Sequence, residues 1–340
     1  MERHVEVDAR PTTAALFDFT SFAKIEVRGR GAAEFLEHLT DNRVARSVGA
    51  LTYTQMLNEG GGIECDFTVT RLAEDRFRIV TGTAFGQHDL YWIRDHVPDD
   101  GSVQVEDITS SLACIGLWGP AARDTLQPLT PTDISNRAFP YMTAQQLAVG
   151  SVPCLALRVT YVGELGWELY CPSEFGLRLW DTIWEAGRGH GVSAGGYKAV
   201  DSLRLEKGYR VWGSDIGPEA NPYEAGLGFT VKLDKGDFIG RDALIKAREA
   251  EPQTRLACLV LEDPRSVALG SEPVRIAGEI TGRVTSGGYG YAVGRSIAYA
   301  YVPAAARPGT SVEVEIFGTW VPGQVADEPL FDPKGTRVRS

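Results

Sequence analysis

RLACLVLE, residues 255–262, marks the point at which the texture of this 340-residue chain changes. Downstream of it, strand-like runs punctuated by Gly and Pro dominate, at residues 259–262, 279–286, 297–302 and 312–317. Short, closely spaced strands with turn residues between them are typical of a small sandwich or barrel. We therefore expect residues 241–340 to form a separate β-rich, barrel-like domain.

Upstream of this point, strands and helices are mixed. Alternating apolar residues predict strands at 24–28, 67–70, 77–80 and 114–118, and a hairpin at 155–161 and 167–170. Helical spacing predicts helices at 32–39, 88–95 and 199–207, and one capped by Ser173 in which Leu177, Trp180 and Trp184 recur as core residues. The first fourteen residues are predicted to be a loose lead-in. Mixed elements followed by a β tail indicate an α+β protein.

The composition argues against several classes of function. Lys and Arg number 34 against 45 Asp and Glu, for a net charge of -11, so neither nucleic acid nor an anionic membrane surface is an expected partner. No run of about 18 apolar residues predicts a membrane span. The first six residues lack the apolar stretch of a signal peptide, so we expect a cytoplasmic location.

The cysteines and histidines predict neither a disulfide framework nor a metal site. The five cysteines are widely spaced and form no CxxC pair, which is typical of reduced, mostly buried thiols. The five histidines are scattered, which also argues against a metal centre. The cysteines are Cys65, Cys114, Cys154, Cys171 and Cys258.

Two glycine-rich segments, at 58–67 and 285–294, invite a nucleotide-binding interpretation. Each lies among strand-like runs and neither opens a helix, so neither can cradle a phosphate at a helix N-terminus. No GxxxxGK[ST] motif is present. The sequence therefore predicts no nicotinamide, flavin or ATP site.

The first of these segments has another interpretation. A glycine turn between two strands is followed by Asp66, which would be presented from a rigid support, and Tyr53 stands thirteen residues earlier on the preceding strand. The alternative is that Asp66 is a solvated aspartate at the end of a hairpin.

RVTYVGELGWE, residues 158–168, is a second candidate. Its two glycines predict a strand–turn–strand in which Tyr161 and Glu168 lie on opposite arms of one hairpin. An aromatic beside a carboxylate suits a heterocycle, because one stacks on the ring while the other accepts hydrogen bonds from ring amines. The alternative is an exposed glutamate.

A third candidate begins at DSLRLEKGYRVWG, residues 201–213, and continues through 221–241. Arg204, Lys207 and Arg210 fall on one face at helical spacing. They could form a basic binding face, or simply a solvated or salt-bridged helix surface.

Taken together, these stretches resemble the aminomethyltransferase family, which includes the glycine-cleavage T-protein. The resemblance runs from about residue 16 to residue 330. Within the family, residues 203–244, 284–289 and 296–303 are most similar to the folate-binding portion of dimethylglycine and sarcosine dehydrogenases and to folate-dependent demethylases.

The resemblance implies a three-domain cloverleaf around a central tetrahydrofolate cavity, with interleaved folate-binding domains in residues 1–240. It assigns the catalytic carboxylate to Asp66, at the family's own spacing from Tyr53, which we place in the cofactor site. Cys65 replaces a second acidic residue of the family. Tyr161 and Glu168 correspond to the residues that contact the pterin.

Departures from the family pattern affect the expected partners. An arginine that contacts folate in T-proteins corresponds to Val200, and an asparagine corresponds to Gly82. Residues 21–23 lack the usual histidine, and residues 207–210 lack the signature cysteine of the family's iron–sulfur maintenance protein. The lipoyl carrier protein of glycine cleavage is therefore not an expected partner.

The resemblance implies an enzyme that moves a methyl group from a small methylated donor to tetrahydrofolate. One alternative is the folate half of a two-component amine oxidase, in which a separate oxidase partner supplies carbon for 5,10-methylenetetrahydrofolate. A second alternative is a non-catalytic folate-binding regulatory protein.

Overall fold

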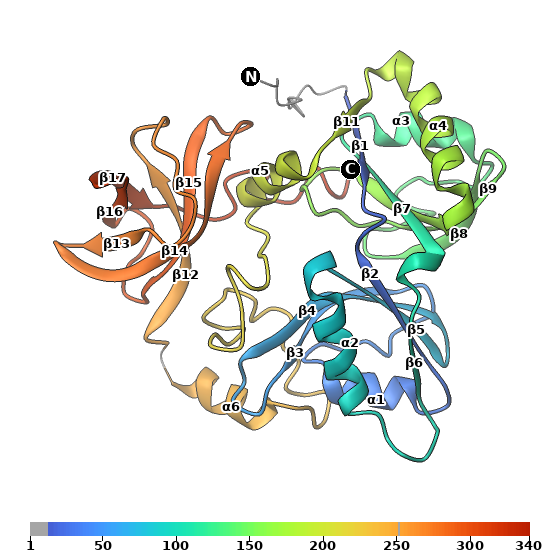
Figure 1. Ribbon diagram of the computed structural model, residues 1–340, viewed down its shortest axis with the longest axis horizontal. Helices are drawn as coiled ribbons and strands as arrows, with labels where there is room; N and C mark the ends of the chain where they lie inside the picture. Colours follow the sequence, from blue (N-terminus) through green and yellow to red (C-terminus); the bar gives the residue numbers. More distant parts are fainter. Residues whose placement is uncertain (1–12, 251) are drawn as a thin grey trace.

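The computed structural model describes residues 13–250 and 252–340, whose strands form two open sheets and a closed barrel (Figure 1). The predicted lead-in lies, up to residue 12, outside the described residues. The α+β class and the C-terminal barrel are both confirmed.

The first sheet is antiparallel, with strand order β3-β4-β5-β2-β6. Helices α1 (Ala32–Leu39) and α2 (Gly86–Asp95) pack their apolar residues against one face of it. Its strands are β2 (Ala23–Arg28), β3 (Leu51–Leu57), β4 (Ile63–Ala73), β5 (Arg76–Thr81) and β6 (Gln104–Asp107).

The second sheet has strand order β11-β1-β7-β10-β9-β8, and only the pair β1–β11 is parallel. Helices α3 (Ala122–Leu126) and α4 (Gly176–Gly187) cover its outer face. Its strands are β1 (Ala15–Asp18), β7 (Leu112–Trp118), β8 (Ala144–Val149), β9 (Val152–Leu157), β10 (Gly166–Pro172) and β11 (Ser193–Gly195).

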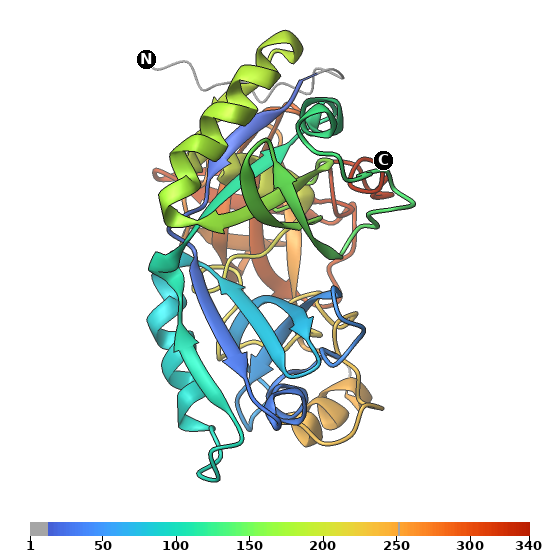
Figure 2. The same cartoon turned by 90° about the vertical axis from the view of Figure 1, so that its right-hand side faces the viewer.

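The two sheets are interleaved in the chain, because β1 precedes the whole of the first sheet and β7 returns to pair with it. Figure 2 shows the sheets one above the other, with α4 and α2 on their outer side. Short 3-10 helices occupy several of the connections: η1 (Thr83–Phe85), η2 (Thr109–Ser111), η3 (Gln127–Leu129), η4 (Ser173–Phe175) and η5 (Arg188–His190).

The barrel closes in the order β12-β15-β14-β13-β16-β17 around an interior of small and β-branched residues. Helix α6 (Arg241–Glu249) leads into it, and α5 (Tyr197–Lys207) packs against its strand β14. Its strands are β12 (Thr254–Leu261), β13 (Pro273–Ile276), β14 (Glu279–Gly290), β15 (Arg295–Pro303), β16 (Ser311–Ile316) and β17 (Thr319–Val325).

Alternation of side chains along two strands separates the core from a shared inner face. On β4, Cys65 and Phe67 pack into the core beneath α1 and α2, whereas Asp66 faces the other way. On β10, Trp167 packs beneath α4, whereas Glu168 faces the other way. The two sheets therefore present carboxylates toward the same interior space.

Three local predictions were wrong. Strand β9 ends at Leu157, so Tyr161 lies in a loop rather than on a hairpin arm. Ser173 is the first residue of η4 and makes no side-chain cap; its hydroxyl donates to the Ser110 carbonyl at 2.6 Å. Helix α5 ends at Lys207, as predicted, before Gly208 in the left-handed region (φ 73°), so the prediction that Arg210 shares a helical face with Arg204 and Lys207 is wrong.

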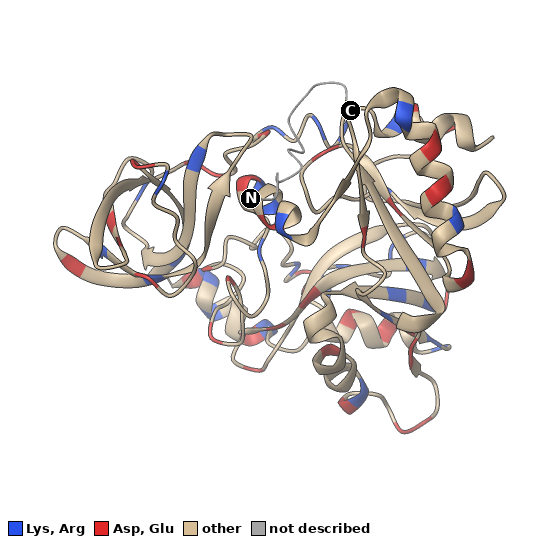
Figure 3. Cartoon of the chain, turned by 45° about the horizontal axis from the view of Figure 1, so that its top comes forward, with Lys and Arg blue, Asp and Glu red and all other residues tan. Residues whose placement is uncertain are grey.

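The five cysteines are all buried and free, as expected. Among the described residues, no helix combines the length and the apolar character needed to cross a bilayer. Figure 3 shows Lys and Arg interspersed with Asp and Glu over the helices and the barrel.

Candidate functional site

A cavity of about 980 Å³ lies where the two sheets meet the segment that follows α5 and the C-terminal segment. Its walls are largely apolar and aromatic, with few polar groups, which is typical of a site for a small organic ligand. The aromatic lining includes Phe19, Tyr53, Tyr141, Tyr209, Trp212 and Phe229.

Asp66 reaches this cavity from β4, and it is not an exposed hairpin-end residue. Gln55 lies directly opposite it on β3 and donates from Nε2 to Asp66 Oδ1 at 2.8 Å; the Tyr53 hydroxyl also hydrogen-bonds to this carboxyl. Burial raises the pKa of Asp66 to about 7, opposed by these two hydrogen bonds and assisted by the neighbouring carboxyls of Asp41 and Asp89. A carboxyl with this pKa exchanges protons near neutral pH.

Glu168 faces the cavity from β10 in the second sheet. The Tyr170 hydroxyl donates to Glu168 Oε2 at 2.6 Å. Burial raises the pKa of Glu168 to about 6, while the Tyr170 hydrogen bond and the positive charge of Lys24 lower it. Lys24 is fully buried, and its Nζ donates to the carbonyl oxygens of Thr20 at 2.7 Å and Phe22 at 3.0 Å.

Tyr161 also lines the cavity, although it reaches it from the loop between β9 and β10. Its hydroxyl donates to the Arg210 carbonyl at 2.8 Å, and its ring stacks on Tyr209 with the centroids 5.8 Å apart. Tyr53 stacks on Phe229 at 6.4 Å. The structure therefore brings Asp66, Tyr53, Tyr161 and Glu168 into one cavity, as the sequence predicted for a single site.

The three cationic residues near the end of α5 do not form a free basic face, because each is buried and ion-paired. The ion pairs are Arg204 with Asp215 at 2.8 Å, Lys207 with Asp332 at 3.1 Å and Arg210 with Glu328 at 2.5 Å. The pairs of Lys207 and Arg210 tie the end of α5 and the residues after it to the C-terminal segment, whereas Arg204 pairs with the segment that follows α5. All three pairs leave little net charge for a ligand. The salt-bridged alternative is the one the structure shows.

The C-terminal segment supplies lining residues that sequence reasoning missed. Lys334 and Arg339 both line the cavity and are exposed. The segment is held in place by Arg158, whose Nη2 donates to the Ser340 carbonyl at 2.9 Å, and by an ion pair between Arg337 and Glu164. No local signal could have found these residues, because they lie more than 250 positions after Asp66 and follow the barrel.

Two of the positions at which the sequence departs from T-proteins, Val200 and Gly82, line the cavity. Val200, on α5, is buried and apolar, and Gly82 follows β5. The wall therefore lacks a cation and an amide at these two places. The negatively charged groups of a ligand would therefore need other partners. Lys334 and Arg339 are cations that line the same cavity.

Behind β4, the fold brings together Cys65, His88 and Asp89, whose donor atoms lie within 4.8 Å of one another. The scattered histidines gave no hint of this group. His88 Nδ1 lies 3.1 Å from Asp89 Oδ1 and His88 Nε2 lies 3.3 Å from Glu64 Oε1. Burial raises the pKa of the Cys65 thiol well above its ordinary value. None of the three donors lines the cavity.

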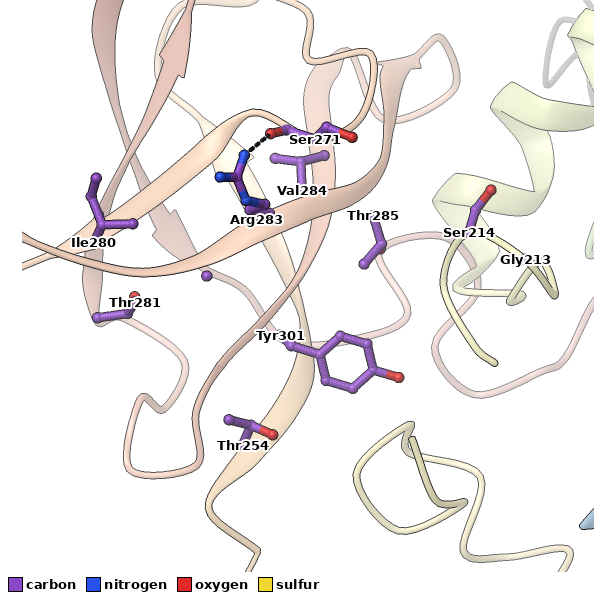
Figure 4. Close-up of a pocket in the computed structure, with 11 residues that line it drawn as sticks. Gly213, Ser214, Thr254, Ser271, Ile280, Thr281, Arg283, Val284, Thr285 and Tyr301 are labelled. Atoms are coloured by element: carbon purple, nitrogen blue, oxygen red, sulfur yellow. Dashed lines mark hydrogen bonds between the residues drawn. The ribbon is translucent and has the colours of Figure 1, made fainter. Parts of the chain in front are cut away.

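A second hollow, of about 620 Å³, opens beside the barrel (Figure 4). Its lining comes mainly from β14 and includes Arg283, whose Nη1 donates to the Ser271 carbonyl at 3.2 Å, and Tyr301. No described Asp or Glu lines it. It lacks the opposed carboxyls that distinguish the central cavity.

Comparison with protein-family models gives two matches that together cover most of the chain. The model of the GCVT N-terminal domain matches residues 3–235, and that of the glycine cleavage T-protein C-terminal barrel domain matches residues 254–332. A crystal structure of the glycine cleavage system aminomethyltransferase T from Bartonella henselae superimposes with a TM-score of 0.85 at 28% identity. It covers 96% of this chain and 89% of that one.

Curated relatives fall into two groups of different length. The chain is 39% identical to 4-methylaminobutanoate oxidase (formaldehyde-forming) of Paenarthrobacter nicotinovorans and 37% identical to human mitochondrial dimethylglycine dehydrogenase. Those matches cover 95% and 96% of this chain but only 39% and 38% of the relatives. It is 36% identical to the aminomethyltransferase of Symbiobacterium thermophilum, across 94% of this chain and 86% of that protein.

Proposed function

The chain belongs to the glycine-cleavage T-protein (aminomethyltransferase) family of tetrahydrofolate-binding enzymes, and we propose that it transfers a methyl group from a small methylated donor to tetrahydrofolate. The observation that carries this proposal is that Asp66 and Glu168 face one aromatic-lined cavity from two different sheets. One carboxyl is available for the cofactor ring and the other for the reacting amine.

The cavity fits the pterin of tetrahydrofolate. A pterin is a flat ring bearing several N–H donors, and Glu168 is an enclosed acceptor whose position is fixed by Tyr170. Tyr161 and Tyr209 supply flat apolar surface nearby. Glu168 would therefore accept hydrogen bonds from the ring while the aromatic residues pack against it.

Tetrahydrofolate supplies the nucleophilic ring nitrogen that receives the carbon unit. Asp66 would orient this amine and accept the proton that the nitrogen loses as its bond to the methyl carbon forms and the donor's leaving group departs with the bonding electrons. Its raised pKa suits this exchange near neutral pH. Holding donor and acceptor together in the cavity would supply most of the remaining rate enhancement.

A second candidate is the folate half of a two-component amine oxidase, which would form 5,10-methylenetetrahydrofolate from carbon that a separate oxidase has oxidised. The observation that favours it is the similarity to 4-methylaminobutanoate oxidase (formaldehyde-forming) and to dimethylglycine dehydrogenase, of whose length this chain spans about two fifths. A purely regulatory folate-binding protein is less favoured, because binding alone does not require a carboxyl at the position of Asp66 in the cavity.

The lipoyl carrier protein of glycine cleavage is not a proposed partner. The arginine and asparagine of T-proteins are replaced by Val200 and Gly82 on the cavity wall. Ammonia release from an aminomethylated carrier, at a rate typical of T-proteins, would contradict this part of the proposal.

One assay with purified protein, tetrahydrofolate and a methylated amine separates the two candidates. Formation of 5-methyltetrahydrofolate without added oxidant, detected by mass, supports the methyltransferase. If product appears only when an amine oxidase is supplied, and is then 5,10-methylenetetrahydrofolate, the second candidate replaces the first. Because free formaldehyde condenses with tetrahydrofolate unaided, the rate must be compared with that of the Asp66→Asn variant.

A further inference from the structure

A second buried carboxyl, Asp41, lies behind Asp66 and does not line the cavity. It follows α1, and it is fully buried. Its Oδ1 accepts hydrogen bonds from the backbone N–H of Gln55 at 3.0 Å and from the Thr54 hydroxyl at 2.8 Å. Among the described residues, its other oxygen, Oδ2, has the hydroxyl of Thr230 as its hydrogen-bond partner, at 3.1 Å.

The Thr230 hydroxyl lies within hydrogen-bond distance of three acceptors but has one proton to give. They are Asp41 Oδ2 at 3.1 Å, Gln55 Oε1 at 2.7 Å and the Leu227 carbonyl oxygen at 2.7 Å. The Leu227 carbonyl already accepts the Thr230 backbone N–H at 3.0 Å. That carbonyl oxygen has a donor whichever way the hydroxyl points, so the oxygens that depend on the hydroxyl proton are those of Asp41 and the Gln55 side chain.

If both carboxyls were ionised, this competition could not be resolved. A proton given to Gln55 Oε1 would leave the Asp41 Oδ2 anion facing the Thr230 oxygen without a donor. If the Thr230 proton were given to Asp41, Gln55 Oε1 would face the Thr230 oxygen at 2.7 Å with no proton between the two oxygens. Buried oxygens in that condition cost about 1–3 kcal/mol each.

One added proton satisfies every group, in either of two directions. Protonated Asp41 donates to Thr230, Thr230 donates to Gln55 Oε1, and Gln55 Nε2 donates to ionised Asp66, which is the arrangement of the 2.8 Å bond. In the reverse direction the Gln55 amide is flipped: protonated Asp66 donates to Gln55, Gln55 donates to Thr230, and Thr230 donates to ionised Asp41.

We propose that Asp41 and Asp66 share a single proton through Thr230 and Gln55, so that Asp41 is a positioning residue that sets the charge of Asp66. This inference rests on the proposed role of Asp66 in the transfer reaction. This row of hydrogen bonds keeps one of the two carboxyls ionised and the other protonated. The Gln55 amide rotates each time the proton moves from one carboxyl to the other.

The surroundings of the two carboxyls agree with one shared charge. Burial raises the pKa of Asp41 to about 6 and that of Asp66 to about 7, and each ionised carboxyl disfavours ionisation of the other. The positive charge of Lys235 lowers the pKa of Asp41, but its Nζ also lies 3.1 Å from Glu37 Oε2, which offsets that charge. The remaining groups that face the pair are Tyr223 beside Asp41, and Tyr53, Tyr161 and Asp89 beside Asp66.

An infrared titration tests the shared proton without any substrate. In protein labelled with carboxyl-¹³C aspartate, the Asp66 band is the one that Asp66→Asn removes. The amide introduced by Asp41→Asn always has a proton to donate to Thr230. It thereby fixes the hydrogen bonds in the direction that leaves Asp66 ionised. We expect the pKa of Asp66 to fall by about one unit or more, because a neutral group also replaces a buried anion. An unchanged Asp66 titration in Asp41→Asn overturns the proposal, whatever the fate of the proposed activity.

Kinetics with tetrahydrofolate then test the link through Thr230. Thr230→Val keeps the shape but removes the hydroxyl, and we expect kcat to fall about 10-fold while the KM for tetrahydrofolate changes less than about twofold. Thr230→Ser, which keeps the hydroxyl, should recover most of this loss. In Asp41→Asn the acid limb of the pH profile should move to lower pH by the amount seen in the infrared titration. The proposal of a shared proton would be overturned by equal kcat values for Thr230→Val and Thr230→Ser. It would also be overturned if the acid limb of the pH profile did not move in Asp41→Asn.

Discussion

The two carboxyls of the central cavity, Asp66 and Glu168, are both enclosed but have opposite surroundings. Behind Asp66 lie further carboxyls, Asp41 and Asp89, which raise its pKa beyond the effect of burial. Behind Glu168 lies the buried cation Lys24, which lowers its pKa against the effect of burial. The resulting pKa values are about 7 for the aspartate and about 6 for the glutamate, although the ordinary value of an aspartate is the lower of the two.

This difference agrees with the different tasks that we propose for the two carboxyls of one cavity. A group near pH 7 that is backed by another titrating carboxyl exchanges protons readily, which suits the reacting amine. A group backed by a fixed cation remains an acceptor over a wider pH range, which suits recognition of ring N–H groups. The surroundings of each carboxyl, rather than its residue type, therefore distinguish the two proposed roles.

The largest expected effect separates these roles. Asp66→Asn should lower turnover about 100- to 10,000-fold, because it removes the group that exchanges the proton, while folding and tetrahydrofolate binding are retained. The check is kcat measured beside calorimetric binding. Cys65→Ser, one residue away but in the core behind β4, is the matched control and should be mild. An Asp66 variant with half the original turnover would refute the catalytic role.

A change on the opposite wall should act on binding instead. Glu168→Gln keeps the shape of the side chain but loses the negative acceptor, so we expect tetrahydrofolate affinity to fall by about 5- to 150-fold, equivalent to roughly 1–3 kcal/mol. Turnover at saturating tetrahydrofolate should change much less. Calorimetry that shows unaltered affinity would remove Glu168 from the site.

The pH dependence of that binding sharpens the comparison. As the pH falls through about 6, Glu168 becomes protonated and loses acceptor capacity, so the original protein should bind tetrahydrofolate more weakly in acid. Glu168→Gln has no such group, so its affinity for tetrahydrofolate should vary less with pH. Between pH 5 and pH 8 the logarithm of its dissociation constant should stay constant to within about half a unit. Parallel profiles for the two proteins would mean that another group controls acid sensitivity.

The smallest effect concerns a buried carboxyl outside the cavity. Burial raises the pKa of Glu206 to about 7, and its Oε1 accepts the backbone N–H groups of Ala292 at 2.7 Å and Val293 at 3.1 Å. Because the folded state holds this proton more tightly than the unfolded state, the contribution of Glu206 to stability is present below about pH 4.5 and is lost as the pH rises through about 7.

Glu206→Gln keeps the accepting oxygen but cannot ionise. Its free energy of unfolding should therefore decline less than that of the original protein between pH 5 and pH 8, by about 1.4 kcal/mol for each pH unit that separates the raised pKa of Glu206 from its ordinary value. Urea denaturation at several pH values measures this. If the original protein and the variant decline in parallel, Glu206 titrates at its ordinary pKa.

Much of the architecture could be predicted from local sequence. The helix at 32–39 was predicted with its observed bounds, because its apolar residues recur at helical spacing between clear ends. The β texture after residue 255 predicted the barrel, because short alternating strands separated by turn residues have few other solutions. The hairpin prediction extended the strand too far, because Tyr161 lies in an apolar run whose backbone leaves the sheet after Leu157.

What the sequence determined by itself was therefore the fold class, the barrel and, through the resemblance of its motifs to the aminomethyltransferase family, four residues of one cavity. Only the tertiary structure decided how those residues are supported. Asp41 and Thr230 stand 189 positions apart, and Lys334 lies beyond the barrel, so no periodicity or spacing links them to Asp66. The physical reason is that secondary structure follows from neighbours in the chain, whereas burial, pKa and hydrogen-bond competition depend on groups that meet only when distant segments pack together.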